Sequence, residues 1–152
     1  MKVGKEEIMG MLAAIDYWSQ ADLGALNKEW QSRVERVQRL VDTVPGVTSE
    51  ITIPTDGNSY PTLTVTWDEK RFGLTVAQCD QQLREGEPRI EVLTNSNPSG
   101  VLAREKNNKQ RGEGSDRQNR LQIISMTLQP GEDLTVGYRL RQILDKARKQ
   151  SA

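Results

Sequence analysis

The chain has 152 residues, of which 35% are hydrophobic, 21 are basic and 21 are acidic. This size fits one domain with a modest core, and the balanced charge gives no global field to attract nucleic acid or an anionic membrane, so neither is expected as a partner. The absence of histidine removes the commonest general base and most zinc sites, and we predict no metal site.

The N-terminal residues predict a helical arm over 1–44. The first helix spans residues 4–18, and the pattern then continues either as a second helix after a bend near residues 19–22 or as one long bent helix, which Pro45-Gly46 ends. Ser19 and Asp22 have the spacing of a capping box at that bend. The first helix places five apolar side chains on one face, although no strand precedes it to cover them: Ile8, Met11, Leu12, Ile15 and Trp18.

Strand patterns follow the arm. Residues 47–53 and 63–67 alternate between apolar and polar types, and the turn residues 56–59 between them predict an antiparallel hairpin. A capping box at Thr75 and Gln78 begins a short helix, and residues 89–93 are interpreted as a third strand. The inward positions of that short helix are Val76, Cys79 and Leu83.

The C-terminal part alternates between a polar segment and regular structure. Residues 95–120 predict a flexible loop, residues 121–128 a central strand, and residues after Pro130 a final helix. Residues 45–152 would therefore form an α+β small domain of two layers, with a mixed four-stranded sheet covered by helices. The predicted inward face of the final helix is Leu140, Ile143, Leu144 and Ala147.

Three segments carry a family resemblance: Met1–Ile15, Gly86–Val92 and Leu121–Asp133. They resemble the C-terminal small domain of fold-type-I pyridoxal-phosphate enzymes of the selenocysteine synthase-related family. This group, of the aminotransferase class V type, includes L-seryl-tRNA selenium transferase and D-glucosaminate-6-phosphate ammonia-lyase. Met126 stands where the transferase pattern would have an arginine, which favours the lyase-like relatives.

The resemblance implies that the cofactor lysine belongs to a large domain, and we assign no catalytic or cofactor-binding residue here. It implies that Arg89, Lys5 and Lys2 contact substrate. The chain would then be the C-terminal domain, or a truncated form, of a pyridoxal-phosphate-dependent lyase or transferase acting on an amino acid or amino sugar acid. It would shape the active site and the homo-oligomer, with the cofactor-bearing large domain as its partner.

Other interpretations remain open. Arg89 fits a surface ion pair, and Lys2 and Lys5 fit solvated positions at a helix start. The lone Cys79 fits a buried structural thiol in a reducing, cytoplasmic compartment better than a nucleophile. The basic residues of the loop fit a solvated segment better than a phosphate-binding one. The alternative function is a stand-alone, non-catalytic binding or regulatory module whose exposed helix is the partner surface.

Overall fold

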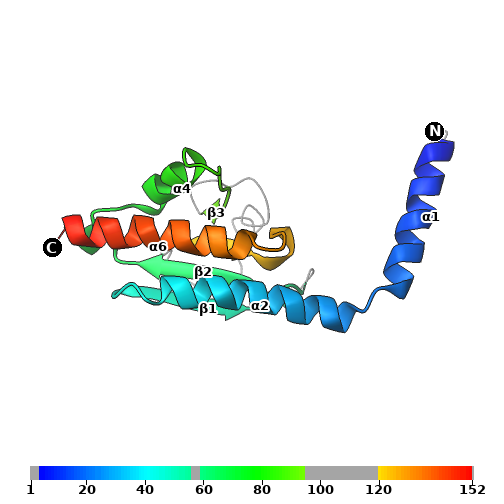
Figure 1. Cartoon of the computed structure of the whole chain (residues 1–152), viewed down its shortest axis with the longest axis horizontal. Coiled ribbons are helices and arrows are strands. Elements are labelled where there is room, and N and C mark those ends of the chain that lie inside the picture. The colour runs from blue at the N-terminus through cyan, green and yellow to red at the C-terminus, as the bar shows by residue number, and fades with distance from the viewer. Residues whose placement is uncertain (1–3, 56–58, 95–119, 152) are drawn as a thin grey trace, which may run out of the picture.

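The computed structural model describes residues 4–55, 59–94 and 120–151. Figure 1 shows a helical layer on a sheet, with one helix projecting from this body. The helices are α1 (Lys5–Gln20), α2 (Leu23–Val41), α3 (Glu69–Phe72), α4 (Val76–Arg84), the 3-10 helix η1 (Ser125–Thr127) and α6 (Glu132–Gln150). The strands are β1 (Val47–Thr52), β2 (Thr62–Trp67), β3 (Leu93–Thr94) and β4 (Leu121–Ile124).

The predicted α+β fold with a four-stranded sheet is confirmed, but the prediction of a mixed sheet is wrong. The strand order is β1-β2-β4-β3, and each neighbouring pair is antiparallel. The path from β2 through α4 to β3 does produce two strands of the same direction, as such a crossover should. They are not neighbours, however, because β4 lies between them and runs the other way.

Two strands are shorter than predicted. The expected strand over 89–93 is only Leu93–Thr94, because Ile90 and Val92 pack into the core and the Ile90 N–H donates to the Leu83 carbonyl at 3.1 Å. Burial of alternate side chains thus imitates a strand pattern here. The expected strand over 121–128 ends at Ile124 and continues as η1, although its central position in the sheet is confirmed.

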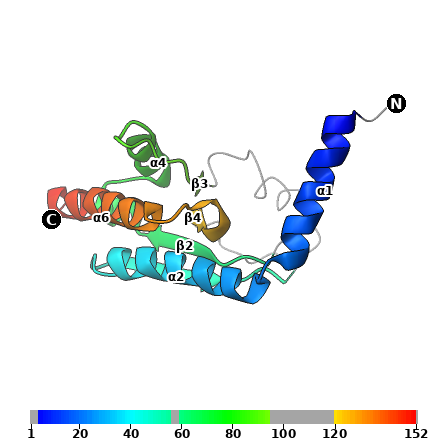
Figure 2. The same cartoon turned by 45° about the vertical axis from the view of Figure 1, so that its right-hand side comes forward.

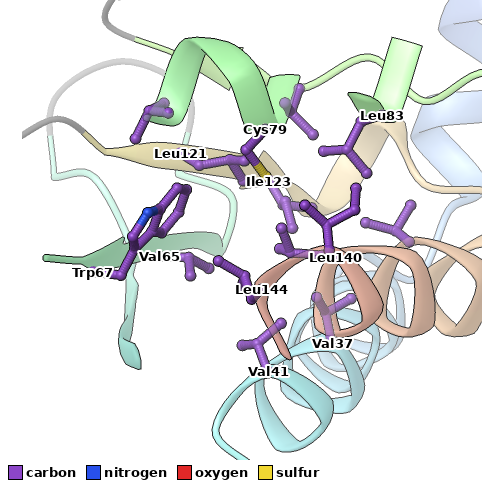
Figure 3. Packing of buried hydrophobic residues seen from close by; sticks show 14 of the residues in the cluster. Val37, Val41, Val65, Trp67, Cys79, Leu83, Leu121, Ile123, Leu140 and Leu144 are labelled. Carbon is purple, nitrogen blue, oxygen red and sulfur yellow. The ribbon is translucent and has the colours of Figure 1, made fainter. Parts of the chain in front are cut away.

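The core lies between the sheet and the helical layer. Figure 3 shows side chains from α2, α4 and α6 meeting those of β2 and β4, and the predicted inward positions of α4 and α6 are confirmed. The Trp67 indole is oriented by its Nε1–H, which donates to the Leu74 carbonyl at 2.8 Å. Fully buried members of this cluster include Val37 and Val41 of α2, Cys79 and Leu83 of α4, and Leu140 and Leu144 of α6.

The bend between the first two helices is confirmed, but its cap differs from the prediction. Asp22 is the N-cap of α2, and its carboxylate accepts from the Ala25 N–H at 2.9 Å. The Ser19 hydroxyl instead donates to the Asp16 carbonyl at 2.8 Å, within α1. Asp22 therefore caps α2 without help from Ser19. Helix α1 extends away from the body in both views (Figures 1 and 2).

Candidate interaction surface

Helix α1 buries none of its residues. The exposed fractions of its large apolar side chains run from 49% at Ile8 to 69% at Tyr17, so none of them is covered by the body of the domain. The segment from Ile8 to Ile15 contains no charged residue, and helices that are apolar all round are normally buried. The large exposed side chains of α1 are Ile8, Met9, Met11, Leu12, Ile15, Tyr17 and Trp18.

An open hollow of about 600 Å³ lies on the inner side of the bend between α1 and α2. Ala13 and Tyr17 line it from α1, and Ala25 and Leu26 line it from α2. Tyr17 follows Ile8 by nine positions, about two and a half helical turns, so the two side chains point to opposite sides of α1. The stripe on the Ile8 side therefore faces away from the bend.

This orientation limits what can cover the stripe. Folding α1 back toward α2 (Figure 2) would bury the small face around Ala13, because that face lines the bend. It would leave Ile8, Leu12 and Ile15 in water. A cover for the stripe must therefore approach from outside the bend, from a surface other than α2.

The sequence predicted the apolar stripe of α1, but it did not predict two further features of this surface: the exposed side chains outside the stripe, and the hollow at the bend. Met9 and Tyr17 lie outside the five positions of the predicted face, and the structure shows both exposed on α1. A full helical projection would have revealed them, because the apolar residues of α1 exceed one face. The hollow depends on the angle at Ala21–Asp22, which no local pattern specifies.

The predicted substrate-contacting residues occupy separate places. Arg89 is exposed and forms an ion pair with Glu91. Lys5 is the first residue of α1 and is exposed, at the end of the helix farthest from the sheet (Figure 1). Lys2 lies outside the described residues. The structure thus does not bring Arg89 and Lys5 together, and the contact of all three residues with substrate stays a prediction.

The Cys79 thiol is buried in the core and is not exposed to solvent. Burial raises the pKa of the Cys79 thiol to about 12, assisted by the nearby Asp80 charge, which disfavours the nucleophilic thiolate. In the described part of the chain, no group of three potential ligands could hold a metal ion. Nor does any helix there have the length and apolar character needed to cross a bilayer.

The described residues do not fit a covalent pyridoxal-phosphate site. Such a site requires a lysine whose amine is desolvated or placed beside another cation, so that it can form a Schiff base. Every lysine in the described ranges is exposed: Lys5, Lys28, Lys70, Lys146 and Lys149.

The architecture defines a two-layer α+β domain with a projecting N-terminal helix. This chain is similar in fold to D-glucosaminate-6-phosphate ammonia-lyase, with a TM-score of 0.65 and 21% sequence identity. The match covers 97% of this chain and 34% of the lyase chain, so the chain spans about a third of that enzyme's length. No family model and no curated protein matches the sequence.

Proposed function

We propose that this chain forms the small-domain part of a pyridoxal-phosphate-dependent lyase or transferase that acts on an amino acid or amino sugar acid. Two observations support this proposal. The fold corresponds to about a third of an ammonia-lyase chain. The segments that resemble the selenocysteine synthase-related family follow one another along this chain in the order that the family has. The fold likeness alone does not give an activity, because one fold serves many functions.

The exposed apolar surface of α1 is the observation that carries the proposal. It is contiguous along the helix, and its Ile8 side faces away from the bend with α2. Such a surface is a typical docking site, and a separate cofactor-bearing domain is the occupant that the family resemblance supplies. The role of the chain would be to shape the active site and the oligomer, while the other domain provides the cofactor lysine.

Within this proposal, Arg89, Lys5 and Lys2 are the substrate-contacting residues. An arginine guanidinium can bind a substrate carboxylate in a bidentate manner. In this structure Arg89 donates from Nε and Nη2 to a single oxygen, Oε1 of Glu91, while Glu91 Oε2 pairs with Arg84. A substrate carboxylate could replace Glu91, because the pair is exposed and an exposed ion pair contributes little stability.

The test is reconstitution with a separately produced cofactor-bearing large domain of a family enzyme. We expect a stable complex in size-exclusion chromatography and weaker complex formation by Ile15→Asp. Leu134→Asp is the matched control, because Leu134 is similarly exposed but lies on α6. Unchanged binding by Ile15→Asp would contradict the proposal.

The alternative function is a stand-alone binding or regulatory module. It is favoured by the continuous core between the sheet and its helices, which this chain completes without α1. The two functions differ in what the purified chain binds. A module of this kind would bind its own partner through α1 and would ignore the large domain, whereas the first function predicts the reverse. A large-domain coding segment immediately upstream in the genome would favour the first.

A further inference from the structure

A second candidate site lies in the groove between α4 and α6, away from α1 (Figure 1). Two adjoining hollows form this groove and share Gln82, Glu85, Ile143 and Lys146 in their linings. The hollow at the Arg139 end has a volume of about 340 Å³, and the other about 430 Å³. The groove is therefore large enough for a small metabolite.

The Arg139 end of the groove holds cations without anionic partners. Arg139 and Lys146 both line it, and no carboxylate of the described residues lies within 4.0 Å of either cation. The Glu85 carboxylate also lines this hollow, but it accepts a hydrogen bond from the Gln81 side-chain amide at 2.8 Å. Arg139 Nε is buried and has no hydrogen-bond partner, which is costly for a charged donor.

Gly86 leaves the space beside it that the guanidinium of Arg139 occupies. A Cβ added at Gly86 would lie 2.1 Å from Arg139 Nη2 and 3.1 Å from its Cζ. The guanidinium thus occupies the space that any other residue at position 86 would fill. Its backbone shows no positive φ that would require glycine there, so close approach to Arg139 is the feature that distinguishes this position.

The spacing of the basic groups indicates the shape of the ligand. Arg139, Gln142 and Lys146 follow one another along the same side of α6 over about two turns, roughly 10 Å of helix. The Gln142 amide stands between the two cations and can donate to the same ligand. We propose that the α4–α6 groove binds a small, elongated anion, whose phosphate or carboxylate groups are held by Arg139 and Lys146.

The test is to titrate the full chain with inorganic phosphate and, separately, with succinate, in a chloride buffer of matched ionic strength. NMR and calorimetry measure the binding. We expect at least one anion to shift the backbone signals of α4 and α6 around Gly86 and Gln142. Arg139→Gln and Lys146→Gln should each weaken binding by about tenfold or more, as the loss of a charge-assisted hydrogen bond does. The anion that binds more tightly identifies phosphate or carboxylate as the ligand chemistry.

Two further variants make the result decisive. Arg141→Gln removes the same charge from the same helix but lies outside the groove, so it should leave binding unchanged. Gly86→Ala keeps both cations but displaces the flexible end of Arg139, and it should weaken binding while α4 stays folded. An equal loss in Arg141→Gln, or no saturable binding of either anion, would overturn the proposal. Failure of reconstitution through α1 would leave this result unaffected, because the two surfaces are separate.

Discussion

Arg36 on α2 donates from its Nε to the carboxylate of Asp133 in the first turn of α6. Asp133 is almost fully buried, with 1% of its surface exposed, whereas about a third of the Arg36 side chain remains accessible. The pair joins the two long helices at one end of the layer. The carboxylate also lies at the N-terminus of α6, where the helix dipole favours negative charge.

Arg36→Met should destabilise the fold by about 3 kcal/mol, because it leaves a buried carboxylate without its cation, and the partly exposed Arg36 puts the pair at the low end of the range for broken buried pairs. Adding Asp133→Asn should recover part of this loss, since the amide carries no charge to solvate. Urea denaturation of the two single variants and the double variant measures their coupling energy. Strictly additive losses would show that the two side chains do not interact.

A pair of leucines contrasts α1 with the core. Leu144 is fully buried, and Leu144→Ala should cost about 2–5 kcal/mol of unfolding free energy through lost burial and a cavity. Leu12 is 55% exposed, and Leu12→Ala should change that free energy by no more than about 0.5 kcal/mol. Thermal and urea unfolding of the isolated chain provide both values. A large loss from Leu12→Ala would mean that α1 packs on its own chain.

Close packing between α2 and α6 depends on Gly137. A Cβ at this position would lie 2.6 Å from Leu40 Cδ1 and 3.4 Å from Val37 Cα. Gly137→Val should therefore force the helices apart and destabilise the protein by about 1–3 kcal/mol. Gly10→Ala is the control, because nothing lies within 4 Å of a Cβ there and alanine favours the helix. Circular dichroism should show equal or greater helicity for that variant.

The sequence predicted those elements whose pattern is local and repeated. The inward faces of α4 and α6 and the hairpin of β1 with β2 follow from periodicity and turn residues, and all are present. The extent of β3 could not be predicted, because Ile90 and Val92 alternate like strand residues and are buried, while the Ile90 N–H donates to the Leu83 carbonyl of α4 and not to a strand. Hydrogen bonding, rather than alternation, decides where a strand ends.

Contacts between distant segments were beyond any local pattern. Arg36 and Asp133 are 97 positions apart, and Arg33 donates to the Leu128 carbonyl across 95 positions. In the sequence, Arg139 and Lys146 are ordinary charged residues of a surface helix. Only the approach of α4, with a glycine at position 86, turns them into the lining of a groove.

Cys79 should make the stability of the protein fall with rising pH in the alkaline range. Its pKa in the folded protein is about 12, above the ordinary value of 9.0, so between these values the unfolded chain releases a proton that the folded chain keeps. The stabilising contribution is complete below pH 9 and declines as the pH rises toward 12, with a slope approaching about 1.4 kcal/mol per pH unit.

Cys79→Ala should remove this part of the pH dependence, although the lost side chain also lowers stability by a constant amount. Urea denaturation of both proteins at several pH values between 8 and about 11 isolates the thiol, because every other titrating group is shared. In the same range, iodoacetamide should react with Cys79 only as fast as the protein opens, since the buried thiol remains protonated. Parallel pH profiles with and without the cysteine would show that its pKa is not raised by folding.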